Sequence, residues 1–138
     1  MKTEEYEVRW LIENEAVLLI QYKDMTVQQL GNMIREVGDL LAQSEKPKIP
    51  VVVDGTHMKA TTNNMGQVVK EFRNVRSEKW GFTIVIDSKG IIKFIAQVIL
   101  QVARVEVKFA GDMKEALDIL YRMDPTLPRL SDDNATNL

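Results

Sequence analysis

The segment from Ile49 to Phe72, IPVVVDGTHMKATTNNMGQVVKEF, shows most directly how this chain folds. It begins with an apolar β-branched run that ends at Asp54, continues as a polar loop, and resumes with apolar residues at helical spacing. A buried strand that leads through a loop into a helix is the repeating unit of α/β sheets. Ligand and switch sites gather where such strands end and helices begin, so the sequence places a candidate site here without identifying its chemistry.

The residues before this unit predict an antiparallel hairpin followed by a helix. Residues 6–12 and 16–22 are rich in strand formers and are separated by a short polar turn at residues 13–15. Thr26 and Gln29 then have the spacing of a capping box, and apolar residues repeat behind them at helical intervals. We therefore expect the first two strands to pair and a helix to connect them to the strand near Val51.

The residues after Phe72 predict two further strand–helix units. The expected elements are a strand over residues 80–86, a helix from Asp87 through residue 103, a strand over 105–109, and a final helix capped by Asp112 and Glu115. The predicted order is therefore β-β-α-β-α-β-α-β-α, an α/β fold with a mostly parallel five-stranded sheet flanked by helices. We assign residues 1–124 to a single domain and residues 125–138 to a loose tail, in which Leu127 and Leu130 are candidates for docking.

Composition narrows the class of protein. The chain has 138 residues, a net charge of −2 and no cysteine. The net charge means that no overall positive potential attracts the chain to nucleic acid. The lack of cysteine excludes disulfides and thiol nucleophiles. Its N-terminus lacks the apolar core of a signal peptide, and no apolar run approaches the about 20 residues that a membrane span needs. We expect a cytoplasmic protein with no membrane span and no cofactor.

This order of elements resembles the STAS domain, named for sulfate transporters and anti-sigma factor antagonists, over roughly residues 6–121. Two segments carry the resemblance: VVVDGTHMKATTNNMGQVV at residues 51–69 and WGFTIVIDSKGIIKFIAQVI at residues 80–99. The sequence also resembles a group of uncharacterised bacterial STAS-like proteins, and CRAL-TRIO lipid-transfer domains, which have a related architecture, are a more distant comparison. The resemblance implies a regulatory, protein-binding role, with a switch loop before the second helix.

One departure from the family lies in that loop. Phosphorylated antagonists carry an Asp-Ser-Ser-Gly-like motif at the helix start, whereas this sequence reads TTNNMG at residues 61–66. The candidate switch or ligand loop consists of Asp54, Thr56, His57, Thr61, Thr62 and Asn63. Either threonine is a candidate phosphate acceptor or a simple helix cap, and Asp54 is a candidate base or cation ligand or the first residue of an Asx-turn. His57 is a candidate general base or a loop residue without a chemical role.

The helix expected over residues 91–104 has an unusually wide apolar arc. Its polar residues fall in one narrow sector, which is flanked by Phe94 and Leu100. Neighbouring helices or the C-terminal tail are one explanation for the excess apolar surface. A second subunit, another partner or a lipid chain is the other, and on that interpretation Phe94 and Leu100 form the interface.

These features favour a non-enzymatic regulatory or protein-interaction module that binds a protein partner or a second copy of itself. The alternative is a carrier for a small molecule or lipid, with an apolar pocket beside the helices of this region. An enzyme ranks third, because no acid–base pair or nucleophile–base arrangement is visible in the sequence. No cluster of His, Asp or Glu has the spacing of a metal site.

Overall fold

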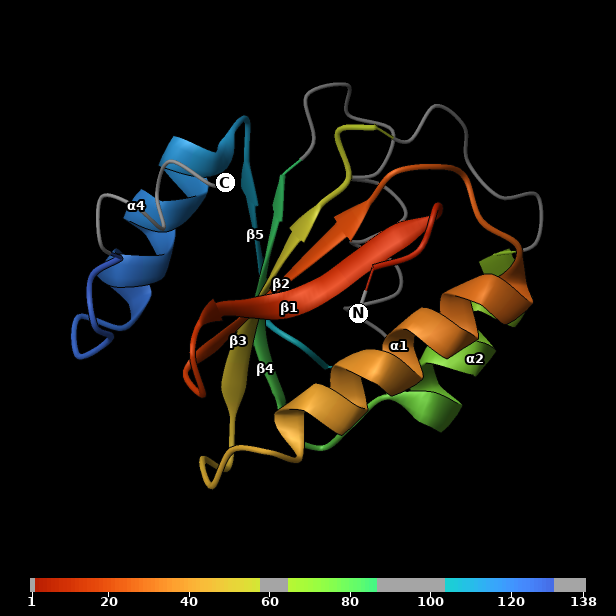
Figure 1. Ribbon diagram of the computed structural model, residues 1–138, viewed down its shortest axis with the longest axis horizontal. Coiled ribbons are helices and arrows are strands. Elements are labelled where there is room, and N and C mark those ends of the chain that lie inside the picture. The colour runs from red at the N-terminus through yellow and green to blue at the C-terminus, as the bar shows by residue number, and fades with distance from the viewer. Residues whose placement is uncertain (1, 58–64, 87–103, 131–138) are drawn as a thin grey trace.

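The computed structural model describes residues 2–57, 65–86 and 104–130 (Figure 1). The elements are β1 (Tyr6–Ile12), β2 (Ala16–Gln21), α1 (Val27–Leu41), β3 (Ile49–Asp54), α2 (Met65–Val75), β4 (Trp80–Ile86), β5 (Val107–Ala110) and α4 (Met113–Met123). This is the predicted α/β fold, with a mostly parallel five-stranded sheet flanked by helices. The helix expected over residues 87–103, including Phe94 and Leu100, lies outside the described residues.

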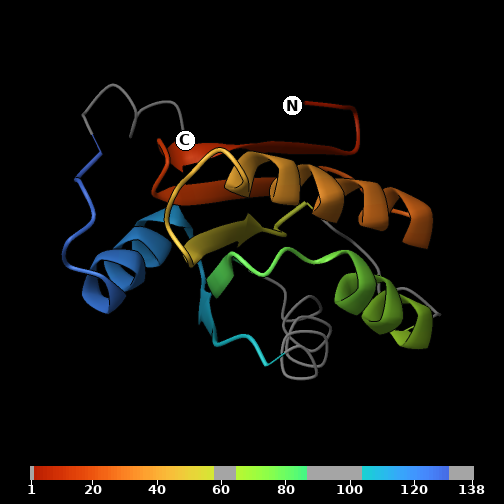
Figure 2. The same cartoon turned by 90° about the horizontal axis from the view of Figure 1, so that it is seen from below.

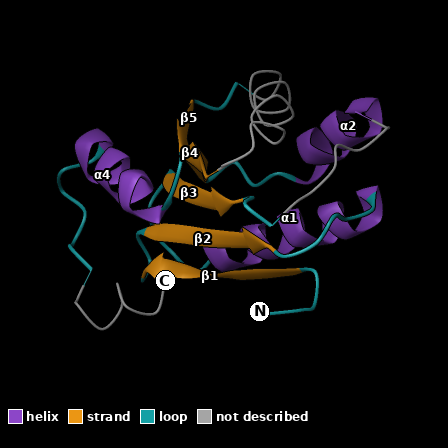
Figure 3. Ribbon diagram, turned by 90° about the horizontal axis from the view of Figure 1, so that it is seen from above, coloured by secondary structure: helices purple, strands orange, loops and turns teal. Residues whose placement is uncertain are grey.

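The five strands follow one another in chain order across the sheet, β1-β2-β3-β4-β5. β1 is antiparallel to β2, as the predicted hairpin requires, and every later pair is parallel (Figure 3). One rung of the parallel part joins Leu19, Val53, Val85 and Phe109. Because β2, β3 and β4 point the same way, the loops that follow them leave from the same edge of the sheet.

Helices cover both faces of the sheet (Figures 1 and 2). α1 and α2 pack together on one face, and α4 packs against β3, β4 and β5 on the other. Alternate residues of each strand point to opposite faces, so neighbours such as Val51 and Val52 belong to different core clusters. Both side chains are fully buried, which explains why β3 is an uninterrupted apolar run.

Capping residues determine where α1 and α4 begin. Thr26 Oγ1 accepts a hydrogen bond from the backbone N–H of Gln29 at 3.1 Å, and the Gln29 side chain accepts one from Thr26 N–H at 3.0 Å. Both halves of the predicted capping box are therefore formed. At α4, Asp112 Oδ1 accepts from Glu115 N–H at 2.8 Å, as predicted, whereas the Glu115 carboxylate accepts from Gly111 N–H at 3.0 Å.

The last strand begins two residues later than predicted. The sequence alternation indicated residues 105–109, but β5 is Val107–Ala110 and pairs with β4 from Thr83 onward. Just before it, Arg104 has a positive φ of 59°, a conformation that breaks extended structure. The alternation of apolar and polar residues could not show that pairing with β4 begins only at Val107.

The segment after α4 packs back onto that helix. Leu127 is 3% exposed and belongs to the α4-side core. The Tyr121 hydroxyl donates to the Pro128 carbonyl at 3.2 Å and accepts from Leu130 N–H at 3.0 Å, and the Arg129 guanidinium lies 3.9 Å from the Tyr121 ring centroid. Residues 125–130 are therefore held by α4. Among the described residues, no helix is long and apolar enough to cross a bilayer.

Candidate functional site

The candidate loop begins at the centre of the sheet edge. Asp54 ends β3 and lies on the same rung as Ile20 of β2 and Ile86 of β4. The next residue, Gly55, donates its N–H to the Ile86 carbonyl at 3.0 Å. Thr56 and His57 follow directly, so these three site residues lie at the carboxyl end of the central strand. Thr61, Thr62 and Asn63 lie outside the described residues.

Asp54 is the first residue of an Asx-turn. Its Oδ1 atom accepts hydrogen bonds from the Thr56 backbone N–H at 3.0 Å and from the Thr56 hydroxyl at 2.7 Å. The sequence left Asp54 as a base or cation ligand or as the first residue of an Asx-turn, and the structure shows the hydrogen bonds of the turn. The Asp54 side chain therefore determines how the chain leaves β3.

A second group of polar side chains lies beside this turn, and we call it the Tyr22 cluster: Glu7, Arg9, Tyr22 and His57. The His57 ring centroid is 5.8 Å from that of Tyr22. The Tyr22 hydroxyl donates to Glu7 Oε2 at 2.7 Å, and Arg9 Nε lies 3.4 Å from Glu7 Oε1. The hydrogen bond to Glu7, together with burial, raises the pKa of the Tyr22 hydroxyl, so this group is a stable neutral donor.

Sequence reasoning identified only His57 in this cluster. Glu7 and Arg9 alternate with apolar residues in β1, which indicated only that they share one face of a strand. Their proximity to Tyr22 depends on the hairpin register, in which Glu7 is opposite Ile20. That register is a property of the folded hairpin, so the two residues could not be connected to the loop beforehand.

The groups of the Tyr22 cluster are paired with one another. Glu7 connects Arg9 and Tyr22, so opposite charges and hydrogen-bonding groups are matched within the protein. Lys2 adds a cation 5.6 Å from the Tyr22 ring centroid. The part of the chain that the structure describes contains no group of three or more His, Asp or Glu residues suited to a metal ion.

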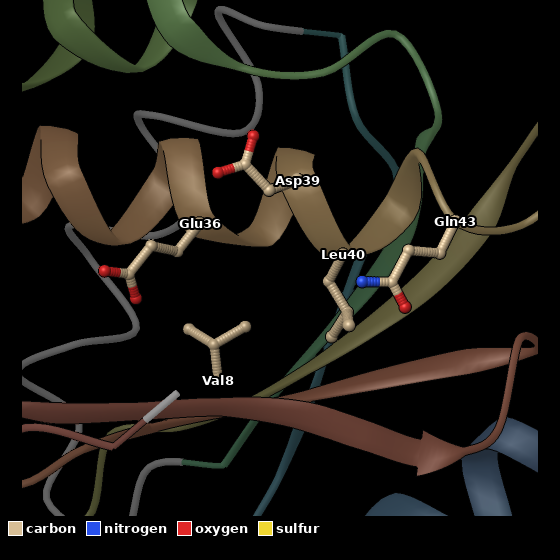
Figure 4. A pocket seen from close by; sticks show the side chains of 5 residues that line it. All are labelled: Val8, Glu36, Asp39, Leu40 and Gln43. Atoms are coloured by element: carbon tan, nitrogen blue, oxygen red, sulfur yellow. The ribbon is translucent and has the colours of Figure 1, made fainter.

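A separate hollow of about 200 Å³ lies between α1 and β1. Its lining residues are Val8, Glu36, Asp39, Leu40 and Gln43 (Figure 4). It was not predicted, because it forms where the partly exposed side of α1 crosses the first strand of the sheet. The carrier alternative expects an apolar pocket beside the helix over residues 91–104, most of which lies outside the described residues.

One solved structure relates this fold to known proteins. It is an uncharacterised protein of the DUF3478 family from Shewanella loihica PV-4, described as having a SpoIIAA-like fold. The TM-score is 0.61 at 17% sequence identity, over 87% of this chain and 98% of that chain. No protein-family model and no curated protein matches the chain. The chain therefore has a SpoIIAA-like fold, in agreement with the STAS resemblance, and at this level of identity the likeness shows the fold alone.

Proposed function

We propose that this chain is a non-enzymatic regulatory or protein-interaction module that uses the start of the β3–α2 connection as its contact surface. The observation that carries the proposal is the position of the Asp54 turn beside the Tyr22 cluster, at the carboxyl end of the central strand. Carboxyl ends of parallel strands are where sheets of this class bind their ligands. The SpoIIAA-like fold of the neighbour is compatible with this proposal.

The chemistry of this surface suits recognition of another protein. Tyrosine and arginine are enriched among the residues that contribute most to protein interfaces, because they combine large contact area with directional hydrogen bonds. Tyr22 and Arg9 are each held by Glu7, so they lose little side-chain freedom when a partner binds. His57 is exposed at the margin of the cluster and provides a further contact.

A phosphate on Thr61 or Thr62 is the proposed switch. Phosphorylation adds about −1.5 to −2 charges at neutral pH, and a phosphate just before α2 (Met65–Val75) would interact favourably with the helix dipole. The added charge would also change the potential near His57, which is close to both threonines in the sequence, and thereby the partner that the surface accepts. Intact mass after expression in the native host tests this step, with Thr61→Val and Thr62→Val as the variants that remove each acceptor.

Site-specific photocrosslinking tests the contact surface itself. A photoreactive amino acid at position 57 should give one dominant protein adduct in host cells. The same group at Asp118, an exposed position on α4, serves as the control and should not give that adduct. Identical adducts from the two positions, or none from position 57, would contradict the proposed surface.

The carrier alternative makes a different prediction. A carrier purified from its host retains a small molecule that native mass spectrometry detects as added mass. The hollow between α1 and β1 does not favour this function, because Glu36, Asp39 and Gln43 place polar groups in its lining.

A further inference from the structure

The N-terminal segment runs beside β1 and extends a row of residues that crosses the sheet (Figures 2 and 3). Glu7, Ile20 and Asp54 lie opposite one another on neighbouring strands, and Lys2 pairs with Glu7 in an isolated antiparallel bridge. Residues paired in this way direct their side chains to the same face of the sheet. Ile20 packs against the α4-side core, so this row lies on the α4 face. The segment therefore brings Lys2 to the Tyr22 cluster.

Lys2 places its ammonium group over the Tyr22 ring, 5.6 Å from the ring centroid. The quadrupole of an aromatic ring attracts a cation in this position, although the attraction is weak at an exposed site. Lys2 is exposed and forms no ion pair among the described residues. The backbone next to it is fixed separately, because Thr3 N–H donates to the Tyr6 carbonyl at 2.8 Å. The Lys2 side chain can therefore leave the ring while the segment stays paired with β1.

The groups around the ring suit a long cationic side chain. The hydrogen bond to Glu7, burial, and then the charges of Glu7 and Asp54 raise the pKa of the Tyr22 hydroxyl, so both carboxylates act at this position. Arg9 lies 3.4 Å from Glu7 and offsets that charge, whereas Asp54 leaves the surface with a negative charge. Ile20, between the two carboxylates, is partly exposed. Lysine and arginine combine an apolar stem with a charged head, which matches this arrangement.

We propose that the partner of this surface presents a lysine or arginine side chain to the Tyr22 ring, and that Lys2 occupies this position in the free protein. The stem of the incoming side chain packs on Ile20, and its charged head takes the place of Lys2 over the ring. Lys2 is thus an internal competitor that every partner must displace. The inference rests on the proposed function, because it names the chemistry of the partner that the contact surface accepts.

Peptide selection on the whole protein tests the chemistry of the partner. Random peptides of roughly ten residues are selected on Lys2→Ala, which leaves the ring uncovered, and counter-selected on the double variant Lys2→Ala, Tyr22→Leu. We expect the enriched peptides to share a lysine or arginine. Replacing that residue by norleucine, which keeps an apolar stem, should weaken binding at least about fivefold. Adding Tyr22→Phe to Lys2→Ala, which keeps the ring, should preserve most of the affinity.

Lys2 should oppose this binding. The best peptide should bind Lys2→Ala about two- to fivefold more tightly than the wild type, because the competing cation is gone. The control Lys23→Ala removes an equal charge near the same cluster, where Lys23 lies 3.8 Å from Glu4, and should bind as the wild type does. In NMR spectra of the wild type, the Tyr22 ring current should shift the Lys2 ε-methylene protons upfield, and the peptide should return them to their ordinary position.

Three results would each overturn the inference: enriched peptides without a cation, an affinity that Lys2→Ala does not raise, or Lys2 resonances that the peptide leaves unchanged. Enrichment of acidic peptides would also overturn it and would assign the surface to anions. Any of these results, combined with a dominant photocrosslink from position 57, would leave the proposed function standing. Displacement of Lys2 by a cationic peptide without that crosslink would contradict the proposed function and support the cation site alone.

Discussion

Asp54 illustrates how one side chain shapes the candidate site. Its Oδ1 atom accepts two hydrogen bonds from Thr56, and this turn sets the direction in which the chain leaves β3. A carboxylate committed in this way is less available as a base or a cation ligand. The neighbouring rings of Tyr22 and His57, whose centroids lie 5.8 Å apart, are the other groups that our proposal assigns to this surface.

At the same scale, ionisation of the Tyr6 hydroxyl makes the free energy of unfolding depend on pH in the alkaline range. Burial, followed by the effect of Glu36, raises its pKa from 10.0 to about 12. The unfolded chain releases this proton at lower pH than the folded chain, so the stabilisation is complete below about pH 10 and is lost as pH rises towards 12. Its magnitude is about 2–3 kcal/mol. Urea unfolding at about pH 8 and about pH 11.5 should show a larger loss for the wild type than for Tyr6→Phe; equal losses would contradict this account.

Gly81 is required by close approach of two strands. A Cβ at this position would lie 2.9 Å from the Ile49 carbonyl oxygen and 3.0 Å from the Ile49 carbonyl carbon, which are backbone atoms and cannot move aside. Gly81→Ala should therefore lower the free energy of unfolding by about 1–3 kcal/mol in denaturant titrations.

Gly66 provides the matched control for that substitution. A Cβ there meets nothing within 4 Å, and the residue lies within α2. Gly66→Ala should leave stability unchanged or raise it by up to about 1 kcal/mol, because alanine favours helix. If both variants were equally stable, the contact with Ile49 would not be what excludes a side chain at position 81.

At the scale of elements, α1 depends on its N-terminal cap. The reciprocal bonds between Thr26 and Gln29 satisfy backbone donors that the helix cannot satisfy itself. Thr26→Ala should cost about 1 kcal/mol of unfolding free energy, whereas Thr26→Ser retains the hydroxyl and should cost less. Thermal or urea unfolding of the three proteins measures the difference. An alanine variant as stable as the wild type would show that packing against the sheet, and not the cap, determines where α1 begins.

At the scale of the whole molecule, two core clusters on opposite faces of one sheet account for the architecture. The cluster beneath α1 and α2 includes Val17, Val51 and Val85, and the cluster beneath α4 includes Leu18, Val52 and Ile84. Because adjacent residues alternate between the clusters, a shift of one residue in any of these strands would exchange the two cores. Burial on both faces therefore specifies the parallel register.

We further propose an assembly that involves Phe94 or Leu100, which lie outside the described residues. The sequence of residues 91–104 carries more apolar surface than one sheet face can absorb, and Phe94 borders its polar sector. Phe94→Asp should then disrupt a homodimer or partner complex and leave the fold intact, as sedimentation velocity and circular dichroism would show. A wild type that is monomeric at high micromolar concentration, together with an unfolded Phe94→Asp variant, would identify Phe94 as ordinary core.

Local patterns in the chain were sufficient for much of the fold. The hairpin, the capping box at Thr26 and the N-cap Asp112 were predicted because each depends on residues within a few positions of one another. The Asx-turn at Asp54 was one of two interpretations of that residue for the same reason. The order of elements followed from apolar periodicity, since strands and helices bury one face with different repeats. The position of the candidate loop followed from the same pattern.

Other features required the folded chain, because they join residues that are distant in sequence. The Tyr22 cluster exists because the hairpin register brings Glu7 to Tyr22, and the hollow exists because α1 crosses β1. The late start of β5 and the need for glycine at position 81 likewise depend on a neighbouring strand. Periodicity specifies which face of an element is buried, but strand pairing and helix packing determine which side chains meet across the molecule.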